Sequence, residues 1–249
     1  MYQQGRLEKI LEVLRKNGYV TVKYLVSVLQ YSNATVNRDL NILEKQKLVK
    51  RSYGGVEIIE KKGVPLPFRY HKMKSEKLKI AKKASEFIVD GDTIFMDAST
   101  TVEYMTGFLT DKKDITVLTN NMAIVSRLSE YRINVICLGG KVVEPPFMLD
   151  GNDTVTTAMK YHADKAFFST SAITQTGRIK SSGVYGLVHT VMCKNSNQTF
   201  YLADHDKIIN ENQVGKYEID TNDVDYVITD TDFSEEVKKN FKNTKFIKV

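Results

Sequence analysis

Three observations predict that this chain is an α/β protein with a smaller helical part in front. From Ser75 onward, helix-like segments alternate with short runs that are apolar on both faces, a pattern typical of a parallel sheet covered on both sides. The first fifty-odd residues carry three closely spaced helical patterns instead. Residues 1–83 hold 19 Lys and Arg against 7 Asp and Glu, and the remainder holds 17 against 23. A basic part is therefore joined to an acidic part, which points to a polyanion bound by one half.

Composition bounds the class of protein. Hydrophobic residues make up 42% of the 249 residues, enough to bury the core of one large domain or two smaller ones. Since no stretch approaches the roughly 18 apolar residues of a membrane span and the N-terminus has no apolar signal core, we expect a cytoplasmic protein that binds no membrane. Cys137 and Cys193 lie far apart in apolar segments and are predicted to be reduced core thiols. Neither a metal nor a cofactor is expected.

The basic part begins with three predicted helices. The first carries apolar residues at helical spacing and stops at Asn17-Gly18. Thr21 can cap a second helix, and Ser32 can cap a third that runs through Lys47. The connection between these two helices, residues 30–32, is turn-sized. The apolar positions of the first helix are Leu7, Ile10, Leu11 and Leu14.

The third helix has a distinct outer face. Its apolar stripe is Val36, Leu40 and Leu43, so at 100° per residue the opposite face carries Ala34, Arg38 and Asn41, with Thr35 and Asn37 at the flanks. This face is small, polar and basic. Two helices joined by a tight turn, the second presenting such a face, form the helix-turn-helix pattern, in which the second helix reads base edges.

Two short strands around a Gly-Gly turn follow, Leu48-Val49-Lys50-Arg51 and Ser52-Tyr53-Gly54-Gly55-Val56, and predict a wing. Lys50 and Arg51 beside Tyr53 could lie against backbone phosphates, while Asn37 and Arg38 could address bases. The alternative is a three-helix oligomerisation module with a solvated basic face. The predicted DNA-binding residues are Ser32, Asn33, Thr35, Asn37, Arg38, Lys50, Arg51 and Tyr53.

A linker is predicted at residues 58–74, between a winged helix-turn-helix domain at 1–57 and an acidic domain at 75–249. Pro65 and Pro67 oppose a regular helix or a central strand there. The acidic domain is expected to be Rossmann-like, with a mostly parallel sheet. Its predicted strands are Thr93 to Met96, Ile115 to Leu118, Val135 to Leu138, Ala166 to Phe168, Phe200 to Ala203, Tyr226 to Ile228 and Phe246 to Val249.

Polar stretches follow four of these strands: residues 97–101, 119–121, 139–141 and 204–207. Ligands of such folds bind at the carboxyl ends of the strands, where these stretches would meet. The hydroxyl-rich segment from Asp97 to Thr101 opens a helix, so its N–H groups suit an anion. By itself this segment would be read as a helix cap, but together the four stretches favour a phosphate, since capping and phosphate binding use the same N–H groups.

The N-terminal pattern resembles the winged helix of the DeoR family of bacterial sugar-catabolism regulators. The similarity lies in SNATVNRDLNILEKQKLVKRSYGGV, where the family usually has Thr-x-Arg-Arg-Asp-Leu and a His-Gly-Gly-Ala-like turn. Asn37 replaces the first arginine and Tyr53 the histidine, which affects operator sequence rather than DNA binding. The matching residues are Thr35, Arg38, Asp39, Leu40, Gly54 and Gly55.

The acidic part extends this resemblance to the family's ligand-binding domain, a relative of ribose-5-phosphate isomerase and coenzyme A transferases. The similar segments are DGDTIFMDASTT, TVLTNNMAIVSRL, ICLGGKV, DKAFFSTSAI and YLADHDKI. Two departures are Ser99, where the family's phosphate loop usually has glycine, and the absence of an acidic residue in segment 181–186. The resemblance implicates as ligand-binding residues Asp97, Ser99, Thr100, Thr101, Asn120, Gly139, Gly140, Lys141, Asp164, Lys165, Asp204 and Lys207.

The resemblance implies a transcriptional regulator, a repressor of a sugar-catabolism operon, that binds double-stranded operator DNA under the control of a phosphorylated sugar. Because one helix-turn-helix reads a short site, a homodimer or homotetramer is expected. The alternatives are a sugar-phosphate isomerase-like enzyme with an appended basic domain, and a phosphosugar-binding oligomer without a DNA role. No carboxylate pair suited to enediol chemistry stands out, so no enzyme is expected. Of the histidines, only His205 is predicted to lie near the ligand, and His71, His162 and His189 read as structural or surface residues.

Overall fold

The computed structural model of the chain divides into two compact units, Met1–Lys72 and Met73–Val249, called here the winged-helix unit and the α/β unit. It describes residues 3–17, 19–46, 48–52, 55–58, 66–144, 148–181, 185–209 and 217–249. The division after Lys72 lies inside the segment 58–74 predicted to be the linker. The exact extent of that linker stays a prediction.

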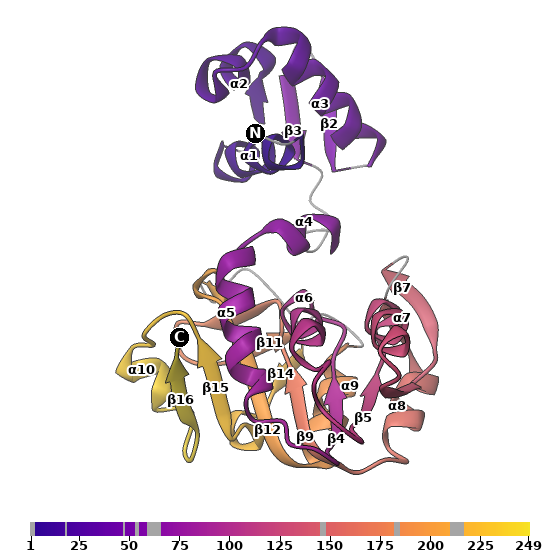
Figure 1. Cartoon of the computed structure of the whole chain (residues 1–249). Coiled ribbons are helices and arrows are strands. Elements are labelled where there is room, and N and C mark those ends of the chain that lie inside the picture. Colours follow the sequence, from indigo (N-terminus) through magenta and orange to yellow (C-terminus); the bar gives the residue numbers. More distant parts are fainter. Residues whose placement is uncertain are drawn as a thin grey trace. The chain divides into compact units, whose positions relative to one another are not determined.

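The winged-helix unit has the predicted three helices and wing (Figure 1). Thr21 and Ser32 cap the second and third helices as predicted, accepting hydrogen bonds from the N–H groups of Tyr24 and Thr35. The three strands form an antiparallel sheet in the order β1-β3-β2. The elements are α1 (Gln3–Asn17), β1 (Tyr19–Thr21), α2 (Val22–Leu29), α3 (Asn33–Lys45), β2 (Val49–Ser52), β3 (Gly55–Ile58) and α4 (Leu66–His71).

The core of this unit confirms the predicted apolar stripes and adds one ion pair. Val36, Leu40 and Leu43 of α3 are fully buried. Beside them Asp39 is only 1% exposed, and Arg6 of α1 donates to both of its carboxylate oxygens, at 2.8 and 3.1 Å. Arg6 therefore fastens α1 to α3 through a carboxylate that has little access to water.

Two elements of this unit differ from the sequence prediction. Strand β1 was not predicted, because three residues carry no periodicity, and it forms by pairing with β3. The expectation that two prolines oppose a helix is wrong for α4, which contains Pro67. Pro67 lies in the first turn, where the backbone N–H has no intrahelical acceptor, so proline costs little there. Lys47, Tyr53 and Gly54 lie outside the described residues.

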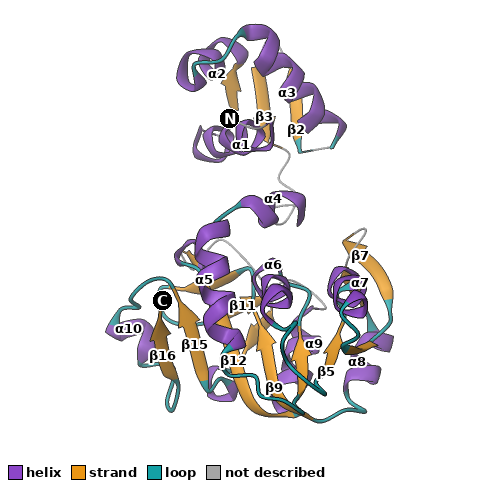
Figure 2. Cartoon of the chain, viewed as in Figure 1, coloured by secondary structure: helices purple, strands orange, loops and turns teal. Residues whose placement is uncertain are grey.

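All seven predicted strands of the α/β unit form, in one fully parallel sheet of order β16-β15-β12-β9-β4-β5-β6 (Figure 2). This confirms the predicted Rossmann-like class. The sheet strands are β4 (Thr93–Met96), β5 (Thr116–Thr119), β6 (Asn134–Cys137), β9 (Ala163–Phe168), β12 (Ser196–Ala203), β15 (Tyr226–Thr229) and β16 (Lys245–Lys248).

Helices cover both faces of this sheet (Figure 1). Phe167 of β9 packs in the core formed with α5, α6, η1 and α7, whereas its neighbours Ala166 and Phe168 belong to cores on the other face, to which α8 and α9 contribute. The helical segments are α5 (Lys74–Ser85), α6 (Thr100–Glu103), η1 (Tyr104–Phe108), α7 (Met122–Glu130), α8 (Asn152–Ala158), α9 (Tyr185–Lys194), η2 (His205–Lys207), η3 (Thr221–Asp223) and α10 (Glu235–Lys238).

Six further strands of the α/β unit, all outside the main sheet, were not predicted. Four of them form a second sheet in the order β13-β10-β11-β14, and β7 pairs with β8 as an antiparallel hairpin. Their bounds are β7 (Lys141–Glu144), β8 (Met148–Asp150), β10 (Ala172–Thr174), β11 (Ile179–Ser181), β13 (Ile208–Ile209) and β14 (Tyr217–Ile219).

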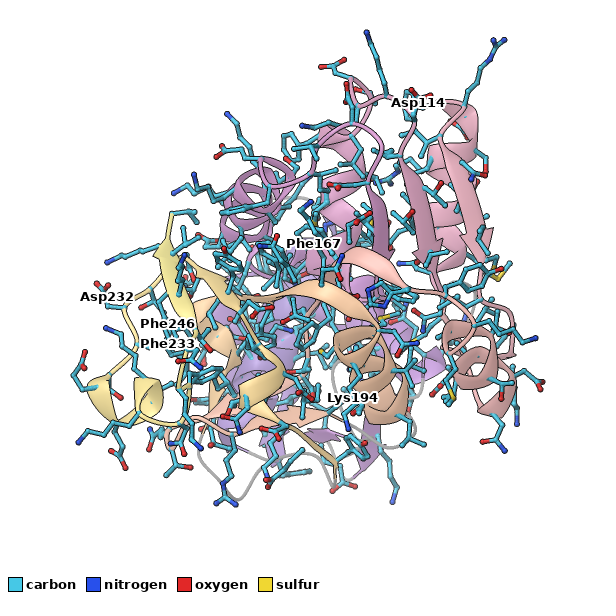
Figure 3. The ribbon with its side chains drawn as sticks, turned by 90° about the horizontal axis from the view of Figure 1, so that it is seen from below. Asp114, Phe167, Lys194, Asp232, Phe233 and Phe246 are labelled. Carbon is cyan, nitrogen blue, oxygen red and sulfur yellow. The ribbon has the colours of Figure 1, made fainter. Side chains whose placement is uncertain are left out.

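An aromatic cluster closes one end of the main sheet, where Phe246 of the edge strand β16 packs against Phe233 with ring centroids 5.6 Å apart (Figure 3). Cys193 is buried as predicted, but the prediction of a core thiol is wrong for Cys137, which is exposed near the end of the opposite edge strand, β6. Within the described part of the chain, none of the helices has the length and apolar character needed to span a membrane.

Candidate functional sites: a recognition helix and a polar strand-end rim

The outer face of α3 matches its sequence prediction. Ala34, Arg38 and Asn41 are exposed, opposite the buried stripe, and Thr35 and Asn37 are partly buried at the flanks. An exposed, polar and basic helix face of this kind can enter a DNA major groove and present side chains to base edges.

Among the predicted DNA contacts, Lys50 and Arg51 have different surroundings. Lys50 is exposed and its ammonium lies 3.8 Å from Glu57 across the wing. Arg51 is turned against α3, where its guanidinium donates to the side-chain oxygens of Asn37 and Asn41. Ser32 caps α3 and Asn33 accepts from Asn37, whereas Tyr53 lies outside the described residues.

In the α/β unit, polar residues follow four strands that are neighbours in the sheet. The order β12-β9-β4-β5 brings together the carboxyl ends that precede Asp204, Ser169, Asp97 and Asn120. Since parallel strands end at the same edge of a sheet, these residues form one polar rim, called here the strand-end site. It comprises residues 97–101, 120, 169 and 204. Ser169 is the member that sequence reasoning missed.

Asp97 organises this rim. Its Oδ1 accepts from the N–H and hydroxyl of Ser99, at 3.1 and 2.6 Å, and its Oδ2 accepts from the N–H of Ser169 at 3.1 Å. His189 Nε2 lies 2.9 Å from the same Oδ2; because a carboxylate only accepts, Nε2 carries the hydrogen. The carboxylate thus receives four donors and holds the loops after β4 and β9 in place.

Ser99 and Thr100 open α6 after this loop. The Ser99 hydroxyl accepts from the N–H of Val102, so Ser99 is the N-cap expected for the segment. Thr100 Oγ1 lies 3.2 Å from the ammonium of Lys77 on α5, whose residue is only 4% exposed. A lysine buried beside a hydroxyl-rich loop supplies positive charge where an anion would bind.

Sequence reasoning missed Lys77, although a signal was present. Lys77 shares a helical stripe, at i, i+3, i+4 and i+7, with residues 80, 81 and 84, and all four are buried. A lysine on the apolar face of an amphipathic helix is rarely buried without a specific role.

Four buried polar atoms at the rim have no hydrogen-bond partner among the described residues. They are Thr101 Oγ1, Asn120 Oδ1, Ser169 Oγ and Asp204 Oδ2, and they are all such side-chain atoms in the described residues of the α/β unit. Asn120 donates through Nδ2 to the carbonyl of Leu149, 2.8 Å away, which leaves its oxygen facing no donor. Buried polar atoms are normally paired, so unpaired atoms gathered at one rim indicate a place where ligand or water completes the bonding.

The remaining predicted ligand residues lie elsewhere or have structural contacts. Asp164 and Lys165 are at the amino end of β9, where they contact Thr93 and Asp92. The strand-end site lies at the other, carboxyl end of the strands. Lys207 donates to the carbonyl of Thr170 at 2.7 Å. The structure therefore does not bring Asp164 and Lys165 to the rim.

The glycine pair after β6 is fixed by packing on one side and open on the other. Gly140 has φ of +114°, and a Cβ there would lie 2.1 Å from the Thr154 hydroxyl and 2.8 Å from the carbonyl of Asp150. Gly139 has φ of +70°, and a Cβ at this position would meet no atom within 4 Å, so it can be approached from outside. Lys141, at the start of β7, is exposed.

Glu103 and His205 are among the ionisable residues near the rim whose pKa values are shifted. Burial raises the pKa of Glu103, which accepts from Asn121 Nδ2 at 3.1 Å. The hydrogen bond to Asp230 raises the pKa of His205. His205, expected beside the ligand, has a half-exposed side chain bound to the end of β15. Among the described residues, no group of three or more His, Cys, Asp or Glu side chains is arranged to hold a metal ion.

A winged helix followed by an α/β unit with a polar strand-end rim is the architecture of a transcriptional regulator that joins DNA binding to a ligand site. Comparison with protein families supports both halves: the DeoR-like helix-turn-helix domain matches residues 6–62, and the DeoR C terminal sensor domain matches residues 72–231. The chain belongs to the DeoR family of transcriptional regulators.

Individual relatives cover most of the chain. It is 33% identical over 233 residues to the HTH-type transcriptional repressor GlcR of Bacillus subtilis (strain 168), covering 92% of this chain and 89% of that protein. It is 33% identical over 214 residues to the lactose phosphotransferase system repressor of Lactococcus lactis subsp. lactis, covering 83% and 84%. The glycerol-3-phosphate regulon repressor of Escherichia coli (strain K12) is 30% identical over 214 residues, covering 83% of each chain.

Solved structures show more distant similarity. Ribose 5 phosphate isomerase A from Neisseria gonorrhoeae has a TM-score of 0.39 at 16% identity, and the match covers 54% of this chain and 53% of that chain. The translation initiation factor eIF-2B from Pyrococcus horikoshii OT3 has a TM-score of 0.48 at 13% identity, covering 91% and 82%. The fold assignment depends on the parallel strand order of the α/β unit rather than on these values.

Proposed function

We propose that this DeoR-family regulator is a repressor of a sugar-catabolism operon, and that a phosphorylated sugar bound at the strand-end site changes its affinity for operator DNA. It binds double-stranded DNA in the cytoplasm through α3 and the wing, as a homodimer or homotetramer. The observation that carries the ligand half is the group of four unpaired buried polar atoms on a rim whose loop contacts buried Lys77.

The chemistry of the rim fits a phosphorylated polyol. Lys77 and the hydroxyls and N–H groups of Ser99 to Thr101 offer donors and positive charge to a phosphate. Asn120 Oδ1 and Asp204 Oδ2 are acceptors only and need hydroxyl donors from the ligand. The relatives named for lactose, glycerol 3-phosphate and a phosphotransferase system favour the same class of effector.

The test is operator binding by fluorescence anisotropy, repeated with a panel of sugar phosphates that includes glycerol 3-phosphate, ribose 5-phosphate and glucose 6-phosphate. We expect one or a few of them to change operator affinity and to raise the thermal midpoint, since a ligand at 100 times its dissociation constant stabilises by about 2.7 kcal/mol. If the full panel leaves both operator affinity and melting unchanged, the proposed effector class is wrong.

The DNA half is tested by two variants. Arg38→Ala removes the exposed arginine of α3, and we expect it to reduce operator preference by about 1 to 3 kcal/mol. Lys50→Ala removes a positive charge from the wing, so binding to all DNA should weaken. The slope of the logarithm of the binding constant against the logarithm of salt concentration, called here the salt slope, should fall in magnitude by about 0.9. An unchanged ratio of specific to nonspecific affinity in Arg38→Ala would contradict base reading by this residue.

A sugar-phosphate isomerase-like activity is the second candidate, based on the fold class and the carboxylates Asp97 and Asp204. Asp97 speaks against it, because its carboxylate already accepts four hydrogen bonds and is not placed as a free base. Turnover of pentose and hexose phosphates, measured on the same samples, separates an enzyme from a regulator. Light scattering at concentrations where DNA is bound tests the oligomer.

A further inference from the structure

The recognition helix carries a row of three amides. Asn33, Asn37 and Asn41 recur every four residues on α3, so they lie on one face, about 6 Å apart from one to the next. Asn33 and Asn41 are exposed and Asn37 is partly buried. The row borders Arg38, on the face expected to enter the DNA groove.

Arg51 of strand β2 links this row to the wing. One guanidinium nitrogen, Nη1, donates to Asn41 Oδ1 at 2.8 Å, and the other, Nη2, donates to Asn37 Oδ1. Since a guanidinium has donors only, the amide atoms that face it must be the oxygens. The planar fork of a single arginine thus sets the orientation of two amides, one helical turn apart.

The row continues with the same polarity toward the start of the helix. Asn37 Nδ2 donates to the backbone carbonyl of Asn33 at 2.9 Å and to its side-chain oxygen at 2.6 Å. In the part of the chain that the structure describes, no hydrogen bond uses Nδ2 of Asn41. The polar group that Asn41 presents outward is therefore its NH2.

This orientation has a consequence for base recognition. An asparagine that reads adenine in the bidentate manner must accept from N6 and donate to N7 at once. An amide oxygen that already accepts from Arg51 has one lone pair occupied and its direction fixed, so it is a poorer acceptor for N6, whereas a free NH2 group on the same amide keeps its full donor capacity. Donors match acceptor edges, which guanine offers through N7 and O6 and thymine through O4.

We propose that Arg51 is a positioning residue for base specificity: it holds the amide oxygen of Asn41, so that this exposed residue presents its NH2 group to the operator and disfavours adenine there. The NH2 group of Asn37 is already used by Asn33, so Asn37 supports the arrangement within α3. The inference rests on the proposed function, in which α3 reads DNA. It changes the role of Arg51 from the phosphate contact that the sequence suggests to a contact that acts through Asn41.

The experiment uses the full-length protein and a library of duplexes with a randomised central segment, from which bound sequences are selected and read. Arg51→Lys keeps the charge but cannot form the fork. Lys50→Gln is the matched control, because Lys50 is adjacent on the same strand and contacts Glu57 rather than α3. Salt dependence is measured for each variant on the selected site, and circular dichroism checks the fold.

We expect wild type to select guanine or thymine over adenine at the position under Asn41. In Arg51→Lys this discrimination falls by about 5-fold or more, adenine gains, and the salt slope stays unchanged. Lys50→Gln selects the same bases as wild type with uniformly weaker binding and a salt slope lower by about 0.9. Asn41→Ala, which removes one amide and leaves Arg51, loses the preference at a single position.

Three outcomes overturn the inference. Arg51→Lys can select the same bases as wild type, wild type can select adenine at the position under Asn41, or Asn41→Ala can keep the full preference. If Arg51→Lys is unfolded, the last two outcomes still decide. Each of them leaves the proposed function intact, because wild type then still selects a defined site; a wild type that selects no site contradicts both.

Discussion

Thr101 offers a direct probe of the strand-end site, because its buried hydroxyl has no hydrogen-bond partner in the part of the chain that the structure describes. Replacement by valine keeps the shape of the side chain and exchanges the hydroxyl for a methyl group. A buried polar group without a partner costs about 1 to 3 kcal/mol. We therefore expect Thr101→Val to raise the unfolding free energy of the ligand-free protein by about 1 kcal/mol or more. For a unit of this size, each kcal/mol raises the melting temperature by about 2 to 4 °C.

The same substitution is expected to weaken ligand binding. If the hydroxyl binds a phosphate or a sugar oxygen, its loss costs about 1.5 to 3 kcal/mol, or about ten- to a hundredfold in affinity. Stability and ligand affinity then change in opposite directions, as expected where a binding site carries unsatisfied groups in the free protein.

Thr106→Val is the matched control. Its hydroxyl is also fully buried, but it donates to the carbonyl of Glu103 at 2.8 Å and accepts from Arg127. We expect this variant to lose about 1 kcal/mol and to leave ligand affinity unchanged. Urea unfolding and thermal scans of both variants, with and without sugar phosphate, give the comparison. If Thr101→Val is destabilised as much as Thr106→Val, the hydroxyl of Thr101 is already satisfied and the reasoning fails.

Three further predictions follow from single contacts. Lys77→Met removes a charged donor, so we expect the sugar-phosphate concentration at half-maximal effect to rise about ten- to a hundredfold. Lys79→Met, at an exposed position of the same helix, should leave this concentration unchanged. Equal values for the two variants would exclude Lys77 from the site. Arg6→Met leaves the buried carboxylate of Asp39 unpaired, so the urea midpoint of unfolding should fall. Adding Asp39→Leu should restore the midpoint. If the double variant does not recover, the destabilisation does not come from the unpaired carboxylate. The pKa of His205 is raised, so its ion pair with Asp230 stabilises the fold below about pH 6.5 and is lost as pH rises through the folded-state pKa. His205→Asn should therefore make the unfolding free energy less dependent on pH across this range. The change is expected to be small because the side chain is half exposed.

The sequence was sufficient for regular elements with strong local signals. Seven apolar runs became the seven strands of the main sheet, and Thr21, Ser32 and Ser99 became N-caps. Each of these depends on neighbours in the chain: the spacing of apolar residues, or a hydroxyl three positions before the N–H that it caps.

The contacts that build the sites escaped prediction because their partners are far apart in the sequence. Asp97 is bound by His189 and by the N–H of Ser169, both more than seventy residues away. Arg51 was assigned to phosphates from its charge, while its place against α3 depends on how the wing packs. Strands of two or three residues, such as those of the second sheet, carry too little periodicity to be recognised and form only by pairing.

The central claim is that a phosphorylated sugar at the strand-end site controls operator binding, and the most direct test is an operator-binding curve at increasing sugar phosphate for wild type and Thr100→Ala. Thr100 opens α6 and contacts Lys77, so we expect the ligand midpoint of the variant to rise about ten- to a hundredfold. Operator affinity without ligand and the final effect at saturation should match wild type, because allostery is a coupling energy between two sites. A midpoint that does not move would mean that the loop only caps a helix, and the claim would be wrong.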